Sequence, residues 1–151
     1  MTLAIRTADC LPILIADEQH RAVAAVHAGW RGTVLGIVGE TIRAMTDQFG
    51  TRPEDLVVAI GPGIGACCYT VGPEVGARFE EFFPERNDLS SVAQVDLVET
   101  TIRQLRRNGG ITGQIDSSGL CTRCLADQFH SYRRDGAAAG RMRSAIGIRL
   151  T

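Results

Sequence analysis

The sequence predicts a layered α/β domain, an α+β sandwich in which helices pack on a mixed, partly antiparallel sheet. Short apolar runs that are typical of strands alternate along the chain with longer segments whose apolar residues follow helical spacing. The length of 151 residues suits a single domain, so we assign residues 1–151 to one. With 44% hydrophobic and 22% charged residues, the composition is that of an ordinary globular protein.

The first third of the chain predicts a strand, a β-hairpin and a helix. Residues 3–7 alternate and are rich in strand-forming residues. The apolar runs at 11–16 and 21–27 flank the polar sequence DEQH, which predicts an antiparallel hairpin. Helical spacing then holds over 33–49 and ends at Gly50.

The rest of the chain continues the alternation of strands and helices. The glycine-rich GPGIG at 61–65 lacks the Lys-Ser/Thr of a phosphate-binding loop, so we interpret it as a turn where backbone segments pass closely. The predicted elements are a strand over 55–61, helices over 72–82 and 95–105, a strand over 111–115, a helix or turn over 124–135 and a strand over 143–149.

Charge and composition exclude several classes of partner. Sixteen basic and seventeen acidic residues leave a net charge of −1, which argues against a nucleic-acid-binding protein. The apolar runs are far shorter than the roughly 20 residues of a membrane span, and no signal-peptide pattern opens the sequence. An odd number of cysteines, five, favours reduced thiols. We therefore expect a cytoplasmic protein.

The predicted hairpin brings a cysteine and a histidine together. If the turn is centred between Glu18 and Gln19, Cys10 lies directly opposite His27, with Cβ atoms about 4.5–5.5 Å apart. Thiolate and imidazole are typical ligands of Zn²⁺, and a cysteine beside a histidine is equally a candidate nucleophile. Both interpretations stay open at this point.

The residues after His27 favour a small-molecule site. Gly29 and Gly32 permit tight turns between a strand and a helix. Arg31 lies just before the predicted helix, where an anion would meet a fixed cation and free N–H groups. Trp30 offers a flat apolar face for a ring.

Together these runs resemble the YfiH family, also called the laccase-domain or multicopper polyphenol oxidase family. The similarity extends over nearly the whole chain in five ordered motifs. They are TADCLPILIAD at 7–17, VAAVHAGWRGT at 23–33, AIGPGIGACCYTVGPEV at 59–75, LCTRC at 120–124 and SYRRDGAAAGRM at 131–142.

The resemblance implies a zinc-dependent enzyme acting on purine nucleosides, a monomer or small homo-oligomer. Members cleave adenosine, inosine or methylthioadenosine with phosphate and deaminate adenosine; older descriptions make them copper-dependent laccases. The family's metal ligands include a histidine of an upstream HG motif and the positions of Cys10 and His27. The upstream histidine has no counterpart among the nine residues before Cys10, so we expect a chain that lacks the N-terminal part of the family.

We therefore predict Cys10, His27 and Arg31 as catalytic residues, with Cys10 and His27 also binding the metal. Trp30, Arg133 and Arg141 are the predicted substrate-binding residues, because arginine suits phosphate. A metal-free Cys–His hydrolase and an inactive fragment that serves as a binding or oligomerising module remain alternatives. Three histidines are too few for the several coppers of a true laccase.

Two further features concern metal ligands. Asp9 is a candidate to orient a metal ligand by contacting that ligand and not the metal. Cys121 and Cys124 have the spacing of a zinc knuckle, and Cys67 and Cys68 could complete a four-thiolate site. Neighbouring residues of a strand point to opposite faces, so we do not expect that site to form.

Overall fold

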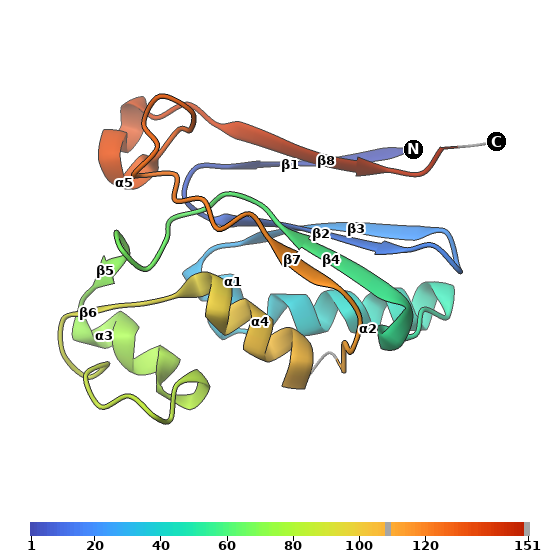
Figure 1. Ribbon diagram of the computed structural model, residues 1–151, viewed down its shortest axis with the longest axis horizontal. Helices are drawn as coiled ribbons and strands as arrows, with labels where there is room; N and C mark the ends of the chain where they lie inside the picture. The colour runs from blue at the N-terminus through green and yellow to red at the C-terminus, as the bar shows by residue number, and fades with distance from the viewer. Residues whose placement is uncertain (108–109, 150–151) are drawn as a thin grey trace.

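The protein is built in three layers around a four-stranded sheet (Figure 1). The structure is a computed structural model that describes residues 1–107 and 110–149. Strand β2 pairs antiparallel with β3 and β4, whereas β7 runs parallel to β4, so the sheet is mixed as predicted. In the order β3-β2-β4-β7, the strands are β3 Ala22–Ala28, β2 Leu11–Asp17, β4 Leu56–Ile60 and β7 Ile115–Ser117.

One face of this sheet forms the core with the helices. Alternate residues of β2, namely Leu11, Ile13 and Ile15, are fully buried, and burial of each such side chain contributes about 1.5–3 kcal/mol. The covering helices are α1 Trp30–Val34, α2 Ile37–Phe49 and α4 Leu97–Arg107, drawn below the sheet in Figure 1.

The opposite face is covered by a two-stranded antiparallel ribbon, β1 Thr2–Thr7 with β8 Met142–Gly147 (Figure 1, top). Exposure alternates along β1, where Leu3 and Ile5 are half-buried and their neighbours on the outer face are exposed. This is the pattern of a ribbon that rests on the sheet with one face only. Because β1 and β8 are the first and last strands, the two ends of the described chain lie side by side in this layer.

The helix predicted over 33–49 is two helices in the structure. Gly36 has a left-handed φ of 75°, which interrupts the helical hydrogen bonding between α1 and α2. Gly50, with a φ of 71°, ends α2 by donating its N–H to the carbonyl of Thr46, as predicted from the sequence. The break lets α1 begin directly at the end of β3.

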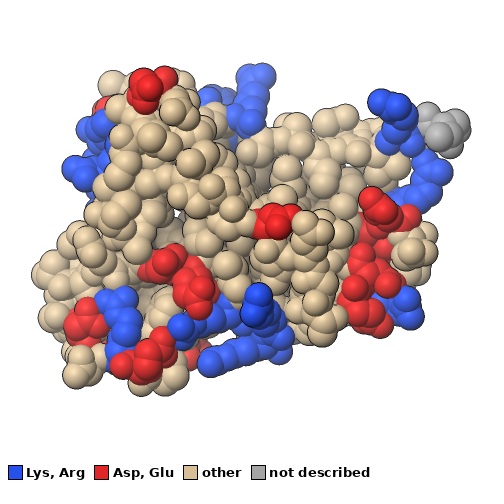
Figure 2. All heavy atoms as spheres, in the orientation of Figure 1, with Lys and Arg blue, Asp and Glu red and all other residues tan. Residues whose placement is uncertain are grey.

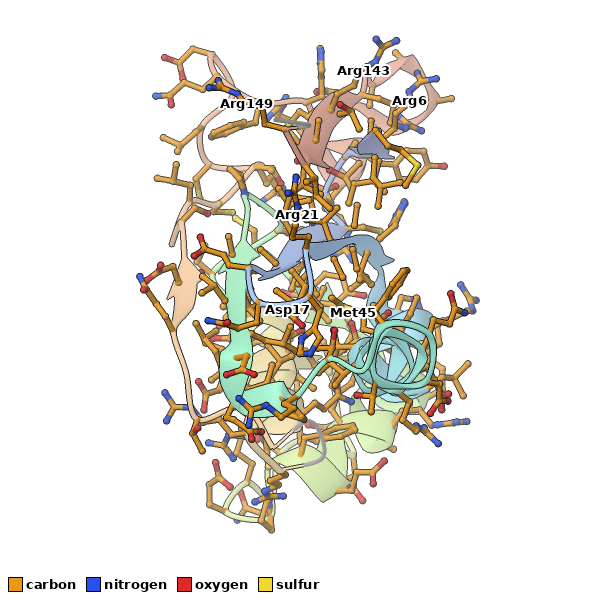
Figure 3. The ribbon with its side chains drawn as sticks, turned by 90° about the vertical axis from the view of Figure 1, so that its right-hand side faces the viewer. Arg6, Asp17, Arg21, Met45, Arg143 and Arg149 are labelled. Carbon is orange, nitrogen blue, oxygen red and sulfur yellow. The ribbon has the colours of Figure 1, made fainter. Side chains whose placement is uncertain are left out.

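The hairpin register predicted from the sequence is wrong by two residues. Pro12, and not Cys10, lies opposite His27. The turn is centred one residue later, because Asp17, the last residue of β2, still pairs with Ala22 of β3. The Asp17 carboxylate caps the turn by accepting a hydrogen bond from His20 N at 3.0 Å. Figure 3 shows Asp17 below the hairpin turn, on the side of the sheet that faces α2.

The strand predicted over 111–115 begins only at Ile115. Ile111 is buried, but its N–H bonds to the carbonyl of Leu105 at the end of α4. Gly113 passes so close to the carbonyl of Leu56 that a Cβ would lie 2.8 Å from that oxygen. The apolar Ile111 therefore packs under the helix and contributes nothing to the sheet.

Short elements complete the chain. They are η1 Pro53–Asp55, β5 Thr70–Val71, α3 Pro73–Gly76, η2 Ala77–Phe82, β6 Ala93–Gln94, α5 Tyr132–Asp135 and η3 Gly136–Ala138. On the face drawn in Figure 2, acidic and basic side chains are interspersed along the lower edge, over the helices. Among the described residues, no helix has the length and apolarity that crossing a membrane requires.

Candidate active site

A cleft of about 370 Å³ lies where β1 and β3 end and α1 begins. This volume falls within the range of small-molecule sites. Its walls carry thiol, imidazole, guanidinium and aromatic groups from segments far apart in the sequence. The lining residues are Arg6, Ala8, Asp9, Cys10, His27, Trp30, Ile64, Tyr69, Tyr132, Arg133 and Arg141.

Cys10 and His27 both line this cleft despite the different register. Because side chains two residues apart on a strand share a face, a shift of two residues leaves the pair on one face. The two residues are thus diagonal neighbours. Cys10 is half-buried, and a Cβ on Gly29 would lie only 2.9 Å from its Sγ. Glycine at position 29 therefore makes room for the thiol.

Asp9 connects three segments beneath the cleft. Its Oδ1 accepts a hydrogen bond from Thr122 Oγ1 at 2.7 Å, and its Oδ2 accepts one from the backbone N–H of Arg133 at 2.6 Å. Its own carbonyl accepts the N–H of Ile64 at 2.8 Å. Asp9 is buried and has a left-handed φ of 81°, a conformation that Asp tolerates better than most residues. It positions the cleft walls relative to Cys10.

Burial and nearby charges set the protonation of two cleft residues. Burial raises the pKa of the Cys10 thiol, the Asp9 carboxylate raises it further, and Arg141 opposes both. Burial also raises the pKa of Tyr69 to about 12, with Arg133 opposing it. Both groups are therefore protonated at neutral pH when no cation is bound.

Two predicted substrate-binding arginines, Arg133 and Arg141, enter the cleft from the C-terminal segment. Arg133 donates to the carbonyl of Thr70 at 2.8 Å, and its guanidinium lies 5.1 Å from the ring centre of Tyr69. Arg141 donates to the carbonyl of Ala139 at 2.7 Å and lies 5.8 Å from the ring of Tyr132. These contacts hold both cations in place before any ligand binds.

Arg31 lies outside the lining of this cleft. Its guanidinium stacks on Trp30, 4.4 Å from the ring centre, and the side chain borders a separate hollow with Val34 and Arg78. Trp30 borders both hollows. Arg31 therefore does not touch the cleft itself; it contacts Trp30, which lines the cleft.

Three lining residues with charged or aromatic side chains were missed by the sequence reasoning: Arg6, Tyr69 and Tyr132. Arg6 lies directly opposite Arg143 across the β1–β8 ribbon, so two like charges are neighbours there. Figure 3 shows both in the outermost layer, at the top of the view. The signal for Tyr69 and Tyr132 was their place inside the quoted motifs; only the folded chain brings Arg6 to them.

The expectation that Cys67, Cys68, Cys121 and Cys124 form no common site is wrong in its geometry. Their four sulfur atoms lie within 4.8 Å of one another. Cys67 and Cys68 lie in a turn, where neighbouring side chains are not forced to opposite faces as they are in a strand. The cluster lies outside the lining of the cleft.

Comparison with known proteins places the chain in a family. The family model described as "Multi-copper polyphenol oxidoreductase laccase" matches residues 1–149. The chain belongs to this family. The similarity to YfiH-type proteins inferred from the motifs is thereby confirmed.

Relatives within the laccase family carry a different activity in their names. The chain is 41% identical over 152 residues to a purine nucleoside phosphorylase of Bacteroides thetaiotaomicron, covering 97% of this chain and 56% of that protein. It is 37% identical to the human purine nucleoside phosphorylase LACC1, covering 99% of this chain and 36% of that protein. The chain thus spans about half the length, or less, of these relatives.

A solved structure similar to this chain has the same fold. YlmD from Geobacillus stearothermophilus superposes with a TM-score of 0.90 at 37% identity, covering 99% of this chain and 57% of that one. The layered α/β architecture predicted from the sequence is therefore confirmed both by the structure and by this comparison.

The cleft contains a thiol and an imidazole that suit zinc, and the carboxylate of Asp9, whose two oxygens are already engaged by Thr122 and Arg133. Cys10 and His27 supply the thiolate and imidazole that Zn²⁺ prefers, whereas a catalytic zinc usually has three protein ligands. Within residues 1–107 and 110–149, no third His, Cys, Asp or Glu joins this pair in a converging set. The other two histidines are engaged elsewhere: His20 contacts Asp17 at 2.8 Å, and His130 packs against Gly140.

Proposed function

We propose that the cleft binds a purine nucleoside together with phosphate and catalyses phosphorolysis of the glycosidic bond. The observation that carries this proposal is the convergence of three aromatic rings and three arginines around Cys10 and His27. The phosphorylase names of the relatives support the same reaction. Adenosine, inosine and methylthioadenosine are the proposed nucleosides.

Two kinds of side chain line the cleft, aromatic rings that suit the purine and arginines that suit the phosphate. Trp30, Tyr69 and Tyr132 offer flat faces on which a purine stacks. Arg6, Arg133 and Arg141 offer guanidinium groups, which bind phosphate through paired N–H donors. A phosphate beside Arg6 would also offset the repulsion between Arg6 and Arg143, which like charges directly opposite each other experience.

In the proposed reaction, a phosphate oxygen attacks C1′ of the ribose. The C1′–N9 bond breaks, the base leaves with the electron pair, and a proton carried by the phosphate ends on the base. The arginines would hold the phosphate close to C1′ and lower the entropic cost of bringing two substrates together. Arg31 would act as a positioning residue, since it stacks on Trp30 at 4.4 Å and does not line the cleft.

Cys10 and His27 would hold a zinc ion together with a ligand from outside the described residues. Zinc supplies Lewis acidity when it is bound at such a site. Asp9 keeps the loop before Cys10 in place through its bonds to Thr122 and Arg133. Deamination of adenosine is part of this proposal on the family resemblance alone, and it is measured as release of ammonia and inosine.

A metal-free cysteine hydrolase is the second candidate, and the electrostatics disfavour it. A nucleophilic cysteine needs a lowered pKa, whereas burial and Asp9 raise the pKa of Cys10. Activity that persists in a chelator and needs no phosphate would favour the hydrolase.

The test is release of base from inosine and adenosine by the purified chain, loaded with zinc, with and without phosphate. We expect ribose 1-phosphate only when phosphate is supplied. Cys10→Ser and Arg141→Gln should each lower kcat/KM by about 10- to 1000-fold, whereas Arg43→Gln on the exposed face of α2 should leave it unchanged. A zinc-loaded chain that releases no base would overturn the proposal for this chain.

A further inference from the structure

The four cysteines outside the cleft have the dimensions of a tetrahedral metal site. The Sγ atoms of Cys67 and Cys68 are 3.8 Å apart, and Cys124 Sγ lies 3.7 Å from the first and 3.4 Å from the second. Cys121 Sγ completes a group whose members all lie within 4.8 Å of one another. A tetrahedron with Zn–S bonds of about 2.3 Å has edges of about 3.8 Å.

Two turns bring the sulfur atoms together. Cys67 and Cys68 lie in a turn closed by hydrogen bonds from the N–H groups of Cys68 and Tyr69 to the carbonyl of Gly65, at 2.9 and 3.0 Å. Cys121 and Cys124 lie in a second turn, in which Leu125 N bonds to the carbonyl of Cys121 at 3.1 Å. The two turns meet through a bridge between Gly63 and Cys121.

The surroundings of the sulfur atoms suit thiolates. Gly65 N donates to Cys121 Sγ at 3.3 Å, and the Arg123 guanidinium donates to Cys68 Sγ at 3.6 Å. Such N–H donors around the ligating atoms are what orients and tunes a metal site. Gly65 is packed against the cluster, since a Cβ there would lie 3.3 Å from Cys67 Sγ and from Cys121 Cβ.

The arrangement favours one ion over two disulfides. In a pair of disulfides each sulfur approaches one partner, whereas here Cys67, Cys68 and Cys124 are separated by three similar distances, between 3.4 and 3.8 Å. Three nearly equal edges place a common centre among the sulfurs. All five cysteines of the chain are free thiols in the structure.

We propose that Cys67, Cys68, Cys121 and Cys124 bind one Zn²⁺ ion as a closed structural site, separate from the cleft. Four protein thiolates leave no open position for a substrate, as in other structural zinc sites. The ion would fasten the turn that precedes Tyr69 to the turn that contains Thr122, which bonds to Asp9. It would thus stabilise two walls of the cleft without taking part in the reaction.

The test measures metal and thiols in the full chain purified under reducing conditions. We expect about one zinc per chain in the Cys10→Ser control, and five reactive thiols in wild type denatured with a chelator. A Cys67→Ser/Cys124→Ser variant should retain less than a tenth of that zinc in the Cys10→Ser background. Zinc retained by this double variant would overturn the proposal. A wild-type chain with only three or one reactive thiols would also overturn it, because those counts indicate one or two disulfides.

A second measurement begins with the wild-type chain, so its first result does not depend on the folding of any variant. Metal-free wild-type chain is titrated with Co²⁺, and we expect the intense visible absorption of tetrahedral tetrathiolate cobalt at one equivalent. Cys10→Ser should give the same spectrum, and Cys124→Ser should bind more than about 100-fold more weakly. Zinc should also raise the melting temperature of Cys10→Ser. Copper or iron in place of zinc, or an octahedral cobalt spectrum, would contradict the assignment.

Discussion

Replacing Asp9 by alanine should strongly destabilise the protein. The buried carboxylate accepts hydrogen bonds from Thr122 Oγ1 at 2.7 Å and from Arg133 N at 2.6 Å. A hydrogen bond to a charged group contributes about 1.5–3 kcal/mol, so losing two costs about 3–6 kcal/mol. Whole domains are stable by only about 5–15 kcal/mol, so Asp9→Ala should lie close to the unfolding threshold.

Urea denaturation of wild type, Asp9→Ala and Asp9→Asn measures this cost. Asparagine tolerates the left-handed backbone at this position and keeps one of the two acceptors, so Asp9→Asn should lose about half as much free energy of unfolding. The exposed Asp127→Ala serves as a control and should change it by less than about 0.5 kcal/mol.

A double-mutant cycle isolates one of the two hydrogen bonds. Thr122 is fully buried, so Thr122→Val removes the donor at nearly constant volume. Combined with Asp9→Ala it should show a coupling of about 1.5–3 kcal/mol. If Asp9→Ala costs less than about 1 kcal/mol, or if Asp9→Asn costs as much as Asp9→Ala, the hydrogen-bond reasoning is wrong.

Three further predictions concern pH, packing and the thiol. Burial alone would raise the pKa of Asp17, but the backbone N–H of His20, the nearby hydroxyl of Thr51 and the ring of His20 together hold the pKa below its ordinary value. The stability that Asp17 contributes is therefore complete above its unfolded pKa of about 3.9 and is lost as the pH falls through the lower folded value. Urea unfolding should show Asp17→Asn destabilised at neutral pH and approaching wild type in acid; an equal loss at every pH would contradict this. Gly76→Ala should destabilise by about 2 kcal/mol or more, because the added Cβ would overlap the carbonyl oxygen of Leu89, whereas Gly39→Ala in α2 meets no atom within 4 Å and should stabilise by about 0.5–1 kcal/mol. Thermal denaturation that ranks these two glycine variants the other way would refute the packing argument. Gly29→Ala places a Cβ 2.9 Å from Cys10 Sγ and should lower base release at least about 10-fold by displacing the thiol, with a change of about 1 kcal/mol in urea unfolding. Unchanged activity would show that the position of this thiol is not critical.

The first four strands were the easiest elements to predict. The alternating residues 3–7 and the apolar runs that follow correspond to β1, β2, β3 and β4, which all occur within one or two residues of the expected bounds. The boundaries that were wrong depend on contacts beyond the local sequence. Ile111 is apolar like a strand residue, but it packs under the end of α4 and so lies outside the sheet.

The site was predictable in its residue types and less so in its geometry. Cys10, His27, Trp30, Arg133 and Arg141 all line one cleft, as grouping the motifs had suggested. The register was wrong, because capping of the hairpin turn by Asp17 is a side-chain contact that strand periodicity does not encode. Arg31 stacks on the indole instead of lining the cleft, because a cation gains a favourable interaction with the face of Trp30 that its position before a helix does not indicate.

The amino-acid sequence was sufficient to predict the layered α/β class, the first four strands and the family, because these depend on local periodicity and on ordered motifs. The contacts between distant segments became visible only in the folded chain. Asp9 bonds to Thr122 across 113 positions, and Cys67 and Cys68 meet Cys121 and Cys124 across more than fifty. A period-two argument fails for adjacent cysteines in a turn, because their directions follow from the turn and from the glycines around it.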